Sequence, residues 1–151
     1  MREFKTAQDI IDFAVRAEEE AVKFYLKLAA SAKNKAMKET FEGFAAEEQG
    51  HAEKLRNIDI EDFTFADETP ITDLHIAEYT NPQVRYESLN YGEVLVIAMN
   101  REKRAFMLYD KLSKMVSNSK LREVFQFLAK EESDHKFRFE AEYDDYVFKE
   151  N

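Results

Sequence analysis

The sequence contains no cysteine, and this absence excludes several classes of site. Disulfide bonds, zinc ribbons, cysteine-ligated metal clusters and thiol catalysis all require that residue. The chain therefore has no thiol chemistry of its own.

Glycine and proline are scarce in these 151 residues: the glycines are Gly43, Gly50 and Gly92, and the prolines are Pro70 and Pro82. Long stretches without either residue favour helices. A composition of 44% hydrophobic and 35% charged residues is typical of a globular protein, and the length suits one core. We therefore expect a single helical domain over residues 1–151.

Long apolar runs and an excess of positive charge are also missing. No run approaches the length of a membrane span. The formal net charge of −9 disfavours a general nucleic-acid binder, because phosphate contacts need clustered Lys and Arg. The first five residues, MREFK, turn polar at once and lack the apolar core of a signal peptide. We expect a cytoplasmic protein without membrane or nucleic-acid partners.

Helical periodicity covers four segments: residues 6–32, 34–56, 90–116, and a last one that begins at 118 or 119 and reaches about 146. Thr6, Asn34 and Asn90 are suitable N-caps. Because only a few residues separate the first two segments and the last two, each pair is predicted to form an antiparallel hairpin, 6–56 and 90–146.

The segment 57–89 between the hairpins holds both prolines and an alternating pattern. It is predicted to be a long, partly extended crossover that makes the second and third helices parallel. One long crossover in a four-helix bundle is the ferritin-like arrangement, so the predicted fold is all-α and ferritin-like.

The two hairpins repeat each other. A shift of 84 positions aligns Glu18 with Glu102, Tyr25 with Tyr109, Glu48 with Glu132, and His51 with His135. Any two similar hairpins would align at their apolar positions. Alignment of glutamates and histidines whose burial is energetically unfavourable is much less expected.

Each helix has an apolar stripe that one glutamate interrupts, and two stripes also carry a histidine. The stripes are Ile11-Ala14-Glu18-Ala21-Tyr25-Leu28, Met37-Phe41-Phe44-Glu48-His51-Leu55, Leu95-Ala98-Glu102-Ala105-Tyr109-Leu112 and Leu121-Phe125-Leu128-Glu132-His135-Phe139. Burying carboxylates is unfavourable without a compensating cation, and no Lys or Arg lies on these stripes. Either the glutamates are protonated, or a positive group that the sequence does not encode lies among them, and metal ions satisfy that requirement.

The spacing places the four glutamates at one level. Glu18 and Glu48 are equidistant from the first turn, and Glu102 and Glu132 are equidistant from the second. One glutamate from each of two helices and a Glu-x-x-His from each of the other two form a di-metal carboxylate ligand set. The predicted ligands are Glu18, Glu48, His51, Glu102, Glu132 and His135. Carboxylate and imidazole ligands suit two iron ions, with manganese or a redox-inactive zinc as alternatives.

These motifs resemble those of the ferritin-like di-iron proteins, specifically the rubrerythrin branch. The resemblance covers both hairpins and is carried by Glu18 with Phe24-Tyr25, by EEQGH at 47–51, by Glu102 with Leu108-Tyr109, and by EESDH at 131–135. It implies that Glu48 and Glu132 bridge the irons, that Glu18 and Glu102 are terminal ligands, and that each histidine completes one iron. Tyr25 and Tyr109 would hydrogen-bond to the ligands.

The sequence departs from rubrerythrins at two points. A further glutamate, towards which iron moves on oxidation, precedes the third-helix ligand by one turn in that family, but Met99 stands there here. The cysteine-ligated rubredoxin domain is also missing. The resemblance implies an oxidoreductase that reduces hydrogen peroxide or dioxygen with an external electron donor, such as a rubredoxin-like protein.

Several alternatives remain open. Tyr25 and Tyr109 could be core aromatics only, and Glu47, Glu131 and His75 are interpreted as surface residues. The protein could instead be a ferroxidase or iron-handling protein, or a non-enzymatic bundle with a structural metal. We expect a homodimer, the commonest assembly for bundles of this size.

Overall fold

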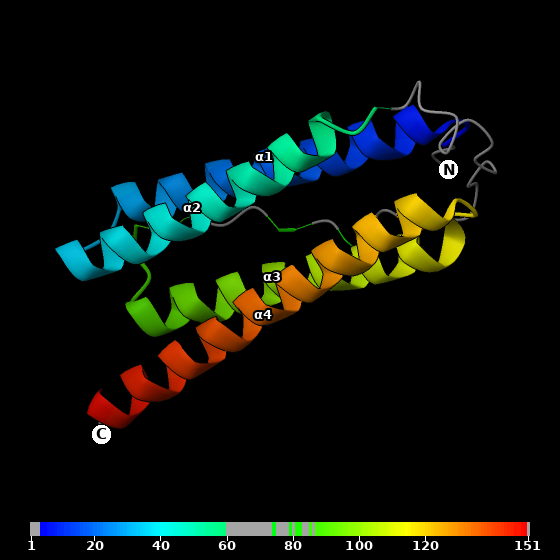
Figure 1. Ribbon diagram of the computed structural model, residues 1–151. Helices are drawn as coiled ribbons and strands as arrows, with labels where there is room; N and C mark the ends of the chain where they lie inside the picture. The colour runs from blue at the N-terminus through cyan, green and yellow to red at the C-terminus, as the bar shows by residue number, and fades with distance from the viewer. Residues whose placement is uncertain are drawn as a thin grey trace. The chain divides into compact units, whose positions relative to one another are not determined.

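The computed structural model describes residues 4–59, 74, 79, 81–82, 85 and 87–150. Within them lie four helices: α1 (Ala7–Ala30), α2 (Lys35–Arg56), α3 (Tyr91–Met115) and α4 (Ser119–Glu150) (Figure 1). These helices confirm the predicted all-α class and all four predicted helical segments.

Short polar side chains fix where the helices begin. The hydroxyl of Thr6 accepts a hydrogen bond from the backbone N–H of Asp9, and the Asp9 side chain accepts one in return from the backbone of Thr6. Asn90 and Glu93 form the same reciprocal pair at the start of α3. The remaining two starts are capped by Asn34 and Asn118. Each cap satisfies backbone donors that have no partner within the first turn.

Two helix ends differ from the expectation. α1 ends at Ala30, and the backbone N–H and the hydroxyl of Ser31, its C-cap residue, both donate hydrogen bonds to the carbonyl of Lys27. α4 continues past Tyr146 to Glu150. No glycine or proline interrupts this stretch, and Lys149 lies 2.9 Å from Asp145 one turn earlier, an arrangement that supports the extra turn.

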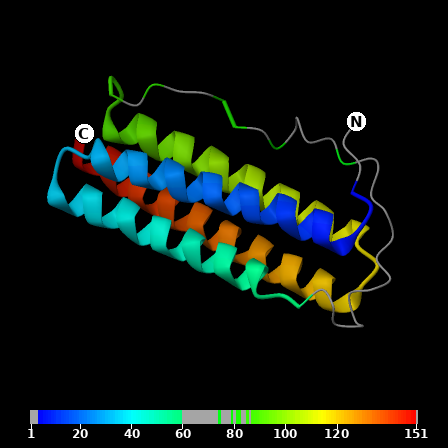
Figure 2. The ribbon, with the colours of Figure 1, turned by 90° about the horizontal axis from the view of Figure 1, so that it is seen from above.

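The chain divides into two compact units, one formed by Phe4–Pro70 and the other by Ile71–Asn151 with Met1–Glu3. In the first unit α1 packs along α2, and in the second α3 packs along α4. Figure 1 shows the two helices of each unit side by side, and Figure 2 shows α1 beside α2 from above. The helix pairs therefore confirm the predicted hairpins.

The predicted stripes are the buried faces of the helices. Only Ala21, Met37 and Ala105 among their members are half-buried, and all the others are buried. Burial of this apolar surface is the main stabilising contribution in each unit, at roughly 25 cal/mol per Å² removed from water. The three-to-four-residue period of the sequence therefore positions the interrupting glutamates inside the protein.

Aromatic residues join the start of α3 to the end of α4. The rings of Tyr91 and Tyr146 meet edge to face with centroids 5.5 Å apart, and the Tyr91 hydroxyl donates a hydrogen bond of 2.9 Å to Glu142. Gly92 lies beneath this contact, where a Cβ atom would come within 2.8 Å of the Tyr146 ring. The Tyr146 ring can therefore pack this closely against α3 because Gly92 has no side chain.

Most of the predicted crossover lies outside the described residues, including its expected extended part and His75. None of the helices in the described part of the chain is both long enough and apolar enough to cross a membrane.

Candidate metal centre

The first unit brings three predicted ligands together. Glu18 is on α1, whereas Glu48 and His51 are one turn apart on the buried face of α2. The Nδ1 atom of His51 lies 3.6 Å from a carboxylate oxygen of Glu18 and 3.6 Å from one of Glu48. All three residues are buried, with exposed fractions of 2%, 1% and 7%. Two carboxylates and one imidazole thus converge on one point inside the hairpin.

The second unit repeats this arrangement. Glu102 is on α3, and Glu132 and His135 are one turn apart on α4. The Nδ1 atom of His135 lies 3.6 Å from a carboxylate oxygen of Glu102. One ligand atom from each of the three residues lies within 4.8 Å of the other two. The internal sequence repeat is therefore also a repeat of geometry.

The distances in both sets suit a shared ion better than direct hydrogen bonds. A separation of 3.6 Å between nitrogen and oxygen is too long for a hydrogen bond. Two ligands bonded to one metal at about 2.0–2.2 Å would lie roughly 3–3.5 Å apart. A small inward movement of these side chains would therefore let each set bind a metal ion.

The donor chemistry narrows the identity of that ion. Each set offers two carboxylates and one imidazole and no sulfur ligand. Hard oxygen donors with imidazole suit iron and manganese, and zinc can also bind them. The residues present therefore fit a transition metal in each set.

Two buried tyrosines lie two turns from the glutamates and are packed by aromatic rings. Tyr25 stacks nearly parallel to Phe41, at 14° and 6.5 Å, and Tyr109 stacks in the same way on Phe125, at 13° and 6.0 Å. Each tyrosine is 1% exposed. These contacts establish a core-packing role, and the predicted hydrogen bonds to the metal ligands stay predictions.

The remaining acidic candidates are closer to solvent. Glu47 is exposed and Glu131 is half-exposed, as expected for helix-surface residues. Met99 is half-buried on α3 and offers no carboxylate at the position where rubrerythrins have a further glutamate.

Sequence reasoning missed Arg101 and Arg104, which line a small pocket beside α3. The repeat held a signal for them, because the shift of 84 positions aligns Arg101 with Ala17 and Arg104 with Glu20. Basic residues on α3 thus replace a small and an acidic residue on α1. The pocket arginines could thus be found only at positions where the two repeats differ in sequence, whereas the candidate metal ligands lie where the repeats agree.

Two solved structures are similar to this chain. One is a Thermotoga maritima protein assigned provisionally as a ferritin-like diiron-carboxylate protein, with 26% identity, a TM-score of 0.74, and coverage of 95% of this chain and 98% of that one. The other is a hypothetical protein from Pyrococcus furiosus, with 27% identity, a TM-score of 0.65, and coverage of 89% and 85%. The fold is therefore ferritin-like, as predicted.

No curated protein matches the chain significantly. The model of the rubrerythrin family matches residues 9–143, which include both hairpins and all six predicted ligands. The chain belongs to the rubrerythrin family.

Proposed function

We propose that the two buried sets together hold two iron ions and that the protein is an oxidoreductase that reduces hydrogen peroxide or dioxygen. The observation that carries this proposal is the repetition of the same buried Glu/Glu/His set in both hairpins. Family membership supports it, as does the diiron-carboxylate assignment of the Thermotoga relative.

The six side chains would have different roles as metal ligands. By likeness to the family, Glu48 and Glu132 would bridge the ions, Glu18 and Glu102 would be terminal ligands, and His51 and His135 would complete one ion each. Four carboxylates roughly balance the charge of two divalent ions, so the buried site would be close to neutral when loaded.

Bound ferrous ions would supply the two electrons that cleavage of a peroxide O–O bond consumes, and two protons complete the conversion of one peroxide to two water molecules. The apolar stripes around the glutamates would exclude bulk water from the site. The aromatic stacks of Tyr25 and Tyr109 would keep the helices in position around the ligands.

The electrons would come from outside the chain. The sequence holds no cysteine and hence no cysteine-ligated iron relay. We propose an external donor, such as a rubredoxin-like protein, that re-reduces the centre after each turnover. A reconstituted assay with reduced rubredoxin and peroxide tests this step. Rubredoxin should be oxidised faster when the iron-loaded protein is present than when it is left out.

Rapid mixing tests the proposal directly. Anaerobic ferrous-loaded protein, mixed with hydrogen peroxide in a stopped-flow spectrometer, should be oxidised faster than the same concentration of free ferrous iron. The E48Q variant should lose this reaction, whereas E47Q, one position away on the exposed face of α2, should retain it. Oxidation no faster than that of free iron would reject the proposal.

Companion measurements separate the alternatives. Storage requires a closed shell of many subunits, so a monomer or dimer in sedimentation would exclude it. A non-enzymatic bundle with a structural metal predicts tight zinc occupancy and no change in the optical spectrum on addition of peroxide.

A further inference from the structure

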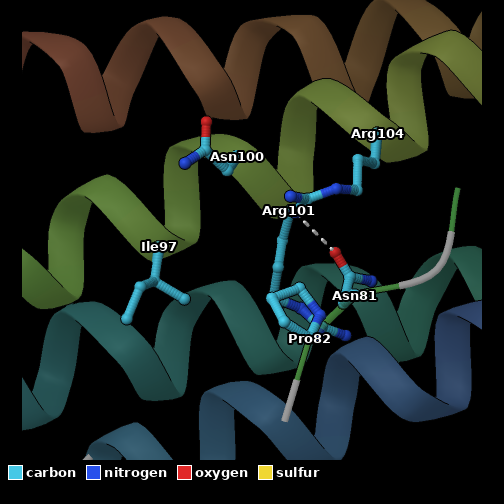
Figure 3. A pocket seen from close by; sticks show the side chains of 6 residues that line it. All are labelled: Asn81, Pro82, Ile97, Asn100, Arg101 and Arg104. Atoms are coloured by element: carbon cyan, nitrogen blue, oxygen red, sulfur yellow. Dashed lines mark hydrogen bonds between the residues drawn. The ribbon is translucent and has the colours of Figure 1, made fainter. Parts of the chain in front are cut away.

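A pocket of about 50 Å³ lies within the second unit, beside α3. One water molecule needs about 10–15 Å³, so the pocket has room for a group larger than a single water. Its lining residues are Asn81, Pro82, Ile97, Asn100, Arg101 and Arg104 (Figure 3). The four that belong to α3 are spaced i, i+3, i+4 and i+7, so they form one face of the helix.

Arg104 is held in place across this pocket. Its Nη1 atom donates a hydrogen bond of 3.1 Å to the side-chain oxygen of Asn81, drawn as the dashed line in Figure 3. Both residues are half-buried, whereas Pro82 and Asn100 are exposed and leave the pocket open to solvent. The guanidinium group is therefore oriented in advance, and a solute can reach it.

The polar lining is rich in hydrogen-bond donors. Two guanidinium groups and two side-chain amides border the same space. Arg101 and Arg104 are three residues apart on one helix face, so one anion in the pocket could contact both side chains. Guanidinium groups bind carboxylate and phosphate oxygens through paired hydrogen bonds.

The surrounding sequence makes this positive cluster unusual. The chain has a net charge of −9, and the equivalent positions of the first hairpin are Ala17 and Glu20. The positive charge on this face of α3 is therefore opposite in sign to the net charge of the chain, and it has no counterpart at the equivalent positions of the first hairpin.

We infer that the pocket bordered by Asn81, Arg101 and Arg104 is a binding site for a small oxyanion bearing a carboxylate or phosphate group. This site uses none of the six candidate metal ligands, so its occupancy does not depend on the proposed redox function.

Calorimetric titration of the full-length, metal-free protein tests the inference, with inorganic phosphate and acetate as separate probes and ionic strength held constant with sodium chloride. The wild type should show saturable binding of at least one probe, and the tighter probe identifies the chemical class. R101Q and R104Q should each weaken that binding about tenfold or more, because each removes a charged hydrogen-bond donor.

K103Q is the matched control, because it removes one positive charge from the exposed face of the same helix turn without touching the pocket. Its affinity for the probe should stay within about twofold of the wild type. Equal weakening in K103Q would indicate general attraction to surface charge and overturn the inference, as would the absence of saturable binding. Circular dichroism confirms folding, and the separate arginine variants keep the test decisive if one of them misfolds.

Discussion

The buried carboxylates should have opposite effects on stability with and without metal. Glu48 is 1% exposed, and its charge is unfavourable in a metal-free interior. We expect E48Q to raise the free energy of unfolding of the metal-free protein by about 1 kcal/mol or more and to abolish the stabilisation that we expect ferrous iron to give the wild type. Urea titrations with and without ferrous iron under anaerobic conditions measure both effects.

E47Q is the control for this prediction, since Glu47 is exposed on the same helix. It should change the unfolding free energy by less than about 0.5 kcal/mol in either condition. A metal-dependent stabilisation that survives in E48Q would contradict the assignment of Glu48 as a ligand.

Tyr91 should make the second hairpin sensitive to alkaline pH. Burial raises the pKa of its phenol above the usual value of 10.0, and the hydrogen bond to Glu142 and the charge of that carboxylate raise it further. Above pH 10 the unfolded chain would release this proton while the folded chain keeps it, so stability should fall as pH rises. The free energy of unfolding, measured at intervals from pH 8 upwards, should fall less steeply in Y91F than in the wild type.

At neutral pH, Y91F should lower the unfolding free energy by about 1–2 kcal/mol, because it removes a hydrogen bond to a carboxylate. Y143F on α4 is a suitable control for general loss of a tyrosine hydroxyl. An unchanged alkaline slope in Y91F would show that this phenol does not control the effect.

The burial of the candidate ligands was predictable at the level of single residues, whereas the contact between Arg104 and Asn81 was not. Glu18 and Glu48 each interrupt an apolar stripe, and this local pattern predicts their burial. Arg104 contacts Asn81, which lies 23 positions earlier in a segment without helical periodicity. Which part of that segment would meet α3 depends on tertiary packing, and no local pattern encodes it.

At the level of helices, Gly43 and Gly92 should respond oppositely to alanine. Nothing lies within 4 Å of a Cβ added at Gly43, so G43A should stabilise α2 by about 0.5–1 kcal/mol through helix propensity. At Gly92 the added Cβ would meet the Tyr146 ring at 2.8 Å, and G92A should destabilise the protein. Thermal unfolding of both variants measures the difference.

The Tyr146→Ala background provides the control for this steric explanation. Without the ring, Gly92→Ala should become stabilising, and the double-mutant cycle isolates the contact between α3 and α4. Stabilisation by G92A in the presence of Tyr146 would contradict the predicted clash with the Tyr146 ring.

The positions of the helices followed from the sequence because their signals are local. Caps such as Thr6 and Asn90 bond to residues three positions away. The contact between Tyr91 and Glu142 spans 51 positions and was not predictable. The end of α4 was underestimated because no stop signal follows Tyr146, and only the i,i+4 pairing of Asp145 with Lys149 indicates that the helix continues.

For the whole molecule, removal of metal should lower thermal stability. A ligand present at 100 times its dissociation constant stabilises the native state by about 2.7 kcal/mol. The iron-loaded protein should therefore unfold at a higher temperature than the chelator-treated protein. Scanning calorimetry measures this shift, and the E18Q/E102Q double variant should show none.

The homodimer expected from sequence stays a prediction at this scale. Sedimentation equilibrium over a range of protein concentrations should give twice the chain mass of 17.8 kDa. A mass of one chain, or of a many-subunit shell, would contradict it.

The division into two hairpins has a consequence for how the chain acquires its structure. In each hairpin, contacting helices are neighbours in sequence, which gives a low contact order and favours rapid folding. Synthesis proceeds at about 5–20 residues per second, slower than a helical hairpin closes. We expect the first hairpin to be formed on the ribosome while the second is still being translated, so that ribosome-bound chains ending near residue 110 should already resist proteolysis between α1 and α2.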